Sequence, residues 1–275
     1  MTATNYITVG DPGVAAFSGS PTTGIAGMTV DFTDESTGGV TSWAWDFGDG
    51  GTATTQDPTH VYTEPGKYTV SLTATNAYGS DIETKAAYLK VGFPDTAPDL
   101  WAFEEILDCV DAEIVGGYED GNYYPGIAVD RAQMAAYVAR MLAGGDSSVP
   151  AGPATATFND VPTDFWAYNY IEYCVAEDIV QGYDAVTYAP ANVVTRDQMA
   201  VYIGRSIAGG DALVPDGPAT ATFDDVPTDY WAFKYVEYCV DNSVVQGYDA
   251  TTYAPLVEVT RDQMAVYVSR TLPLL

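Results

Sequence analysis

The sequence has few basic residues, and this shortage excludes one class of partner. Its 275 residues include 10 Lys and Arg against 38 Asp and Glu, which gives a formal net charge of −28 at pH 7. Sequence-independent binding to nucleic acids depends on Lys and Arg beside phosphates, so we expect no nucleic-acid partner. An acidic surface attracts divalent cations instead, and hard cations such as Ca²⁺ prefer oxygen ligands.

Long apolar runs and catalytic histidines are also missing. No run reaches the roughly 18–20 apolar residues that span a bilayer, so no membrane insertion is expected. The first ten residues lack the basic-then-apolar pattern of a secretory signal. The single histidine, His60, has no second His, Cys pair or nucleophile in a recognisable pattern, which favours a strand residue. We therefore expect no enzyme active site in this chain.

What the sequence does contain is a repeat of 65 residues, which runs without register slips from residue 93 to residue 270. The positions that recur in step are Trp101, Trp166 and Trp231; Gly117, Gly182 and Gly247; Pro125, Pro190 and Pro255; Arg131, Arg196 and Arg261; Arg140, Arg205 and Arg270. A fixed period of this length indicates modules that bury their apolar faces against one another. Equivalent grooves would then be offered three times.

The three cysteines recur in the same register, at Cys109, Cys174 and Cys239. Three cysteines cannot all pair within one chain, and each sits at an apolar helical position of its module. We expect buried thiols that pack as small hydrophobes. A contact near a pseudo-threefold axis or between subunits is the alternative.

Residues 11–92 alternate apolar and polar side chains with a period of two, which predicts short strands and a β-sandwich. The apolar positions are Met28, Val30 and Phe32; Trp43, Trp45 and Phe47; Tyr68, Val70, Leu72 and Ala74. The run from Trp43 to Gly50 reads WAWDFGDG, and HVY and PGKYTV follow it. In these motifs the segment resembles the PKD domain, which implies an Ig-like extracellular spacer without enzymatic activity.

Part of the first ten residues is similar in sequence to the end of this segment. Residues 6–10 (YITVG) mirror residues 88–92 (YLKVG), the last expected strand of the sandwich. Residues 1–10 are therefore interpreted as the remnant strand of a preceding PKD-like copy. We expect a longer protein, with the signal peptide in its upstream part.

Each repeated module is expected to form two helices joined by a loop. In the second module the first helix is predicted to start after residues 162–164 (PTD) and to place Trp166, Ile171 and Cys174 on one face. The second helix is predicted to start at Thr195 with a capping box to Gln198. Its equivalents are Asp130 with Gln133 and Thr260 with Gln263, and pairs of glycines end the first two of these helices.

These modules resemble the S-layer homology (SLH) module. In the second module the resemblance lies in Phe158, Asp160, Trp166-Ala167, Ile171, Gly182-Tyr183, Pro190 and Thr195-Arg196-Asp197-Gln198. It implies a pseudo-threefold all-α helical bundle, with modules at 93–145, 158–210 and 223–275. It also implies non-covalent attachment to a cell-wall polysaccharide, often a pyruvylated polymer, and a place outside the cell, at its surface or wall.

The second and third modules depart from the motif in the loop, where Asp120-Gly121 of the first module gives way to Asp184-Ala185 and Asp249-Ala250. The first module has Asp130 where the motif has Thr. Equal affinity of the three grooves for a ligand is therefore not expected.

Three arginines, Arg131, Arg196 and Arg261, directly follow the N-cap of the second helix. A cation is disfavoured there by about 0.3–1 kcal/mol, because the helix dipole is positive at this end. A protein carboxylate such as Asp160, Asp164 or Asp197 would offset that cost. The alternative is a ligand anion, because free N–H groups and a guanidinium fork suit a carboxylate.

Aromatic side chains of the modules supply the other candidate glycan contacts. Trp101, Trp166 and Trp231 are either core anchors or platforms on which a sugar stacks. The loop residues Tyr118, Tyr183 and Tyr248 are the better candidates.

In the sandwich, Asp46 and Asp49 either hold a Ca²⁺ or accept hydrogen bonds from their own backbone. No cofactor is expected apart from Ca²⁺ in the first of these two interpretations.

The sequence thus predicts a non-catalytic surface-anchoring segment, in which an SLH bundle binds cell-wall polysaccharide and a PKD domain acts as spacer. The alternative is a structural subunit whose copies assemble into an S-layer, a sheet or a filament. The unpaired edge of the first ten residues is its support.

Overall fold

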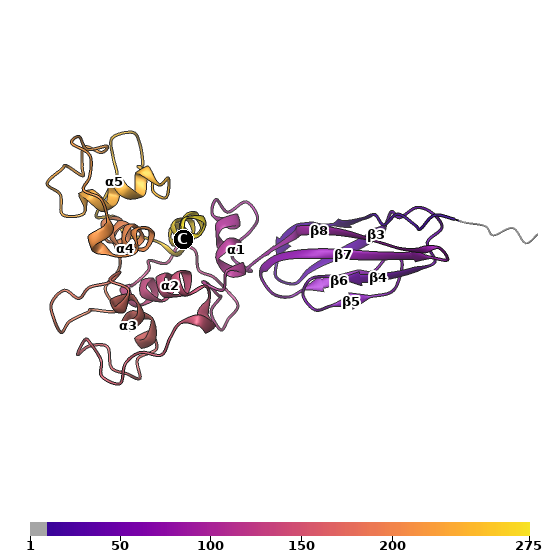
Figure 1. The fold of residues 1–275 in the computed structure, drawn as a ribbon, viewed down its shortest axis with the longest axis horizontal. Helices are drawn as coiled ribbons and strands as arrows, with labels where there is room; N and C mark the ends of the chain where they lie inside the picture. The colour runs from indigo at the N-terminus through magenta and orange to yellow at the C-terminus, as the bar shows by residue number, and fades with distance from the viewer. Residues whose placement is uncertain (1–9) are drawn as a thin grey trace, which may run out of the picture. The chain divides into compact units, whose positions relative to one another are not determined.

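The computed structural model describes residues 10–275, which fall into two compact units divided after Phe103. The first unit is built of strands and the second of helices and loops (Figure 1). The expected remnant strand at residues 1–10 lies outside the described residues except for Gly10.

The strands of the described first unit form two sheets. Their bounds are β1 Phe17–Ser20, β2 Thr23–Ile25, β3 Met28–Asp34, β4 Ser42–Asp46, β5 Thr52–Ala53, β6 Thr59–Tyr62, β7 Gly66–Asn76 and β8 Gly79–Gly92. One sheet has the order β1-β3-β6, and the other has the order β2-β8-β7-β4-β5. All pairings are antiparallel except that of β2 with β8. The expected β-sandwich is thus present.

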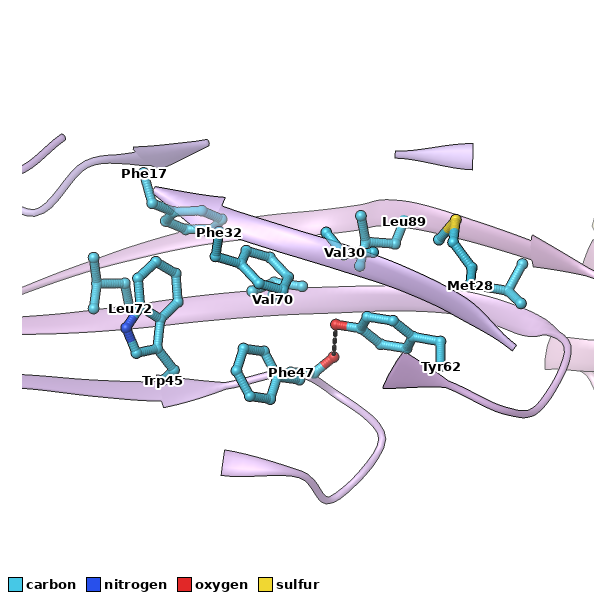
Figure 2. Packing of buried hydrophobic residues seen from close by; sticks show 11 residues of the cluster. Phe17, Met28, Val30, Phe32, Trp45, Phe47, Tyr62, Val70, Leu72 and Leu89 are labelled. Carbon is cyan, nitrogen blue, oxygen red and sulfur yellow. Dashed lines mark hydrogen bonds between the residues drawn. The ribbon is translucent and has the colours of Figure 1, made fainter. Parts of the chain in front are cut away.

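The core of this unit lies between the sheets and includes most of the side chains that the alternating pattern assigned to it, although Trp43 and Tyr68 are only partly buried. Phe32 of β3 packs against Trp45 of β4 with ring centroids 5.4 Å apart, and Phe47 lies 5.1 Å from Phe32. Figure 2 shows these rings together with Tyr62, whose hydroxyl donates to the Phe47 carbonyl at 3.0 Å. That hydrogen bond satisfies the buried phenol, whose desolvation would otherwise be costly.

The helices of the second unit come in pairs, one pair for each repeat. Their bounds are α1 Phe103–Asp111, α2 Arg131–Ala143, α3 Tyr168–Ala176, α4 Arg196–Ala208, α5 Phe233–Asp241 and α6 Arg261–Thr271, with short 3₁₀ turns at Asp146–Ser148, Asp211–Leu213 and Leu272–Leu274. Helices α2, α4 and α6 contact one another, while α3 packs on α2 and α5 packs on α4. Figure 1 shows α2 and α4 at the centre of this unit.

The second helix of each module begins where the sequence predicts, and in the first two modules it also ends there. Capping boxes are present at the starts of α2, α4 and α6, where Gln133, Gln198 and Gln263 complete them. Helices α2 and α4 end at Gly144 and Gly209, whose φ angles of 77° and 79° are left-handed and suit glycine.

The first helix of the second module starts later than predicted. Helix α3 begins at Tyr168, so Trp166 lies in the turn before it. Trp166 is therefore absent from the apolar face that carries the buried Ile171 and Cys174.

Corresponding backbone groups of the three modules bond to one another in a closed circuit. Val129 N–H donates to Val259 O, Val194 N–H to Val129 O, and Val259 N–H to Val194 O, at 2.8–2.9 Å. A second set closes the circuit in the opposite direction: Arg131 N–H donates to Asn192 O, Arg196 N–H to Val257 O, and Arg261 N–H to Ile127 O, each at 2.9 Å. The free N–H groups at the helix starts are thus satisfied by neighbouring modules.

The cysteines follow the same circuit and confirm the prediction of buried thiols. Cys174 Sγ donates to Ala135 O at 3.5 Å, Cys239 to Ala200 O at 3.4 Å, and Cys109 to Ala265 O at 3.4 Å. Burial raises the pKa of Cys174 and Cys239, which keeps them protonated and unreactive.

Within residues 10–275, no helix is both long enough and apolar enough to cross a bilayer.

Candidate functional site

Each arginine after a helix N-cap reaches into the loop of another module. Arg131, from the first module, donates from Nε to Tyr188 O at 2.8 Å, from Nη1 to the Tyr202 hydroxyl at 2.5 Å and from Nη2 to Gln181 O at 2.9 Å. All three acceptors belong to the second module. The guanidinium fork therefore links two modules through directional bonds.

The other two arginines repeat this arrangement. Arg196 of the second module bonds to Tyr253 O, the Tyr267 hydroxyl and Gln246 O of the third, at 2.6–2.9 Å. Arg261 of the third module returns to the first. There it bonds to Tyr123 O at 2.7 Å, to the Tyr137 hydroxyl, and to Gly116 O at 3.4 Å.

The expectation that a protein carboxylate neutralises these arginines is wrong. Asp160 instead accepts the backbone N–H groups of Tyr188 and Ala189, at 2.9 and 2.7 Å. Asp164 is exposed, and Asp197 accepts the Tyr230 hydroxyl at 2.6 Å. Within residues 10–275, ion pairs of arginine occur at Arg140 with Asp146 and Arg205 with Asp211 instead.

The three guanidinium groups are thus buried cations held by neutral acceptors. Arg131, Arg196 and Arg261 are 4–6% exposed. A buried charge without a counter-ion is costly, and carbonyl dipoles and aromatic faces reduce that cost only in part. An anion that reached these groups would gain from the uncompensated positive charge.

Two tyrosine rings flank each guanidinium carbon. For Arg131 the ring centroids lie 4.8 Å away for Tyr183 and 4.3 Å away for Tyr188. Tyr183 is 56% exposed, whereas Tyr188 is fully buried. The equivalent pairs are Tyr248 with Tyr253 beside Arg196, and Tyr118 with Tyr123 beside Arg261. The loop tyrosines predicted to contact glycan therefore lie beside the predicted arginines.

The sequence analysis did not single out the buried tyrosines that contact the arginines. They form two sets that recur with the 65-residue period: Tyr123, Tyr188 and Tyr253, and Tyr137, Tyr202 and Tyr267. Burial raises the pKa of Tyr202 to about 12, while the adjacent Arg131 opposes the shift. The pKa of Tyr137 is likewise raised to about 12 by burial and opposed by Arg261. These phenols stay neutral at physiological pH, so they compensate none of the arginine charge.

Two cavities open beside these arginines, and each is lined by residues of all three modules. The first, of about 190 Å³, lies beside Arg131 and is lined by Tyr183, Gln198, Tyr202, Arg205 and Trp231. The second, of about 540 Å³, lies beside Arg261, and its lining includes Tyr118, Gln133, Tyr137, Arg140, Asp146 and Trp166. Two guanidinium groups, an amide and exposed aromatic rings therefore meet in each cavity.

The cavities differ in size partly because smaller residues line the larger one. Ala136 and Gly116 line the Arg261 cavity, at the positions that Val201 and Gln181 occupy in the Arg131 cavity. The two sites are therefore not equivalent in shape.

The three tryptophans of the repeat are exposed, so the core alternative for them is wrong. Trp101, Trp166 and Trp231 are 56–58% exposed. Trp166 and Trp231 each line one of the two cavities. Trp101 lies in the first unit.

One tryptophan is held in place by a buried carboxylate. Trp231 Nε1 donates to Asp197 Oδ2 at 3.2 Å, and the Tyr230 hydroxyl donates to the same oxygen. The position 65 residues before Asp197 is Ala132, and Phe165 precedes Trp166, so the carboxylate and hydroxyl are special to this cavity. Trp231 is thereby fixed before any ligand arrives.

In the sandwich, both candidate calcium ligands accept hydrogen bonds from their own turns. Asp46 accepts Gly48 N–H at 2.9 Å and Asp49 accepts Gly51 N–H at 2.8 Å. Asp49 also lies 2.6 Å from Nε2 of His60, a residue of strand β6 whose ring stacks on Phe47. Burial alone would raise the pKa of Asp49, but the hydrogen bonds from His60 and Gly51 outweigh it and lower the pKa.

No group of three or more His, Cys, Asp or Glu side chains suited to a metal occurs within residues 10–275. Calcium at Asp46 and Asp49 stays a prediction.

The fold and these sites define a chain with a β-sandwich followed by a threefold-repeated helical region. The family model of the PKD domain matches residues 12–91, and that of the S-layer homology domain matches residues 92–135, 157–200 and 222–265. The chain therefore carries a PKD domain followed by three tandem S-layer homology domains.

Several relatives match more than half of this chain. A cellulosome-anchoring protein of Acetivibrio thermocellus is 28% identical over 156 residues, which are 57% of this chain and 34% of that protein. A surface-layer 125 kDa protein of Lysinibacillus sphaericus is 30% identical over 178 residues, which are 62% of this chain and 14% of that protein. The chain thus spans about a third or less of the length of these relatives. Some other relatives are enzymes.

Among solved structures, the PKD1 domain of Vibrio anguillarum Epp is 31% identical. The match covers 30% of this chain and 98% of that one, with a TM-score of 0.26.

The buried tyrosine hydroxyls that cross between modules should contribute to stability. Tyr188→Phe removes the hydrogen bond of 3.0 Å from this hydroxyl to Arg131 O, so the free energy of unfolding should fall by about 0.5–1.5 kcal/mol. Urea denaturation followed by circular dichroism measures it. The control is Tyr183→Phe at the exposed loop position, which should change stability by less than about 0.5 kcal/mol. Equal effects of the two substitutions would contradict the assignment.

Proposed function

We propose that the three modules form a pseudo-threefold bundle that anchors the protein to an acidic cell-wall polysaccharide, with the PKD domain as a non-catalytic spacer. The main support for this proposal is that buried guanidinium groups without a carboxylate partner line cavities in which Tyr and Trp rings are also exposed. The place of action is the cell surface or cell wall. The cellulosome-anchoring relative supports this role.

The pseudo-threefold arrangement is supported by the closed circuit of contacts between modules. The backbone bonds between Val129, Val194 and Val259 return to their starting point after three steps. The side-chain bonds of the three arginines do the same. A closed ring gives each module two neighbours, so no terminal module has to leave its apolar face uncovered.

A carboxylate-bearing sugar matches the chemistry of the cavities. The fork of a guanidinium binds a carboxylate through paired N–H groups. Beside Arg131 the second cation, Arg205, is bonded to Asp211, so Arg131 carries the local positive charge that remains. The apolar face of a sugar can lie on Tyr183 or Trp231, which are exposed in the same cavity. A pyruvyl ketal, which adds one carboxylate to a sugar, is such a ligand.

Self-assembly into an S-layer, sheet or filament is the second candidate, and the surface-layer relative favours it. Light scattering of the purified chain with and without Ca²⁺ separates the two functions. An anchor stays monomeric in both conditions, whereas an assembling subunit grows in mass.

The exposed tryptophans offer a direct test of binding without loss of the fold. Trp166→Ala and Trp231→Ala should each weaken binding to isolated cell wall about tenfold, equivalent to about 1.4 kcal/mol. Their melting temperatures should change little, because these rings are largely outside the core. The control is Tyr78→Ala, an exposed aromatic of the sandwich that lies outside both cavities. Full binding by both tryptophan variants would refute the site.

Salt should favour binding rather than weaken it. From residue 93 onward the chain has 28 acidic and 7 basic residues, a net charge of −21, and the proposed polymer is also anionic. Repulsion beyond about 10 Å is screened at 0.1 M ionic strength, whereas a contact with a buried arginine survives. Sedimentation with cell walls should show affinity that rises with added NaCl or divalent ions towards a plateau. A steady fall in affinity with salt would exclude this electrostatic account.

A further inference from the structure

Lys234 stands out because it is the sole lysine of the sequence from residue 93 onward. It lies on α5 and lines a separate cavity of about 580 Å³ together with Tyr230, Trp231 and Tyr235. The linker between the second and third modules closes the other side with Asp216, Gly217, Pro218 and Ala219. This cavity contains none of the arginines discussed above.

The charge of Lys234 is only weakly paired with the carboxylate of Asp211. Its Nζ is 4.0 Å from Asp211 Oδ1, which is the limit for an ion pair. That oxygen already accepts Nε of Arg205 at 2.9 Å and the Tyr235 hydroxyl. Arg205 therefore neutralises Asp211, and a long, partly exposed pair such as Lys234 with Asp211 contributes little to stability.

Trp231 joins this cavity to the Arg131 cavity, because the same indole lines both. Its ring is held by Asp197, so the wall between the two cavities is fixed. A saccharide of more than one sugar that enters beside Arg131 would cross Trp231 and reach Lys234.

We infer that the Lys234 cavity is a second subsite for the same polysaccharide, and that it takes an acidic sugar one or more residues along from the sugar bound beside Arg131. This inference rests on the proposed function. The ammonium group binds the second carboxylate as a point charge, and Tyr230, Trp231 and Tyr235 provide aromatic rings for the sugar. The two adjoining cavities thereby bind two acidic sugars of the polysaccharide, where the Arg131 cavity alone binds one.

The second module offers a natural comparison. At the position of Lys234 it has Asn169, which is exposed and donates no positive charge. The subsite is therefore expected in the third module and not in the second.

Calorimetry with acidic cell-wall oligosaccharides of one and of three repeat units tests the inference. The wild-type chain should bind the longer oligosaccharide at least about tenfold more tightly. Lys234→Asn should lose that gain while its affinity for the shorter oligosaccharide stays unchanged, and Lys234→Arg should restore it. The matched control, Asn169→Asp, makes the same change in net charge at the equivalent position and should leave both affinities unaltered.

The outcomes separate the two proposals. If the wild-type chain binds neither oligosaccharide, the anchoring function fails and the second subsite fails with it. If it binds both equally, or if Lys234→Asn and Asn169→Asp weaken both lengths alike, the anchoring function stands and the subsite is overturned.

Discussion

The helical region depends on one interaction, the insertion of an arginine of one module between the loop tyrosines of another. Arg131 shows what it requires: a helix start that places the side chain at the module boundary, and carbonyl groups that the Gly-Tyr loop turns inward. Because the acceptors belong to a different module, neither module can form the site alone. The same bonds that join the modules therefore hold the arginines beside the two cavities.

This use of arginine also reconciles the acidic surface of the protein with the proposed binding of an acidic polymer. Several carboxylates of the region have other partners. Asp160 accepts hydrogen bonds from backbone N–H groups, and Asp146 and Asp211 pair with the arginines of the last helical turn. The three guanidinium groups at the helix starts keep a positive charge that only carbonyls and phenols face. Attraction is thus confined to the cavities, while the surface around them repels anions, which favours specificity over affinity.

Local signals in the sequence were enough to predict the strands of the sandwich and the caps of α2, α4 and α6, because those features depend on residues close in the chain. Contacts between modules were harder to predict. The partners of Arg196, Tyr253 and Gln246, lie 50 or more residues away, and no local pattern distinguishes a carbonyl acceptor from a carboxylate. The placement of Trp166 failed for a related reason: its spacing fits a helix, but α3 begins two residues later. The 65-residue period did contain a signal for the buried tyrosines, because Tyr123 and Tyr188 recur with it.

Amide hydrogen exchange on the intact chain and on Arg261→Leu tests the mutual dependence of the modules most directly. The central claim predicts that loss of this single guanidinium lowers the protection of the Val129, Val194 and Val259 amides together, because each depends on a closed ring. Loss of protection confined to the loop that Arg261 contacts, with Val194 unchanged, would show that the modules are stable independently and would contradict the account.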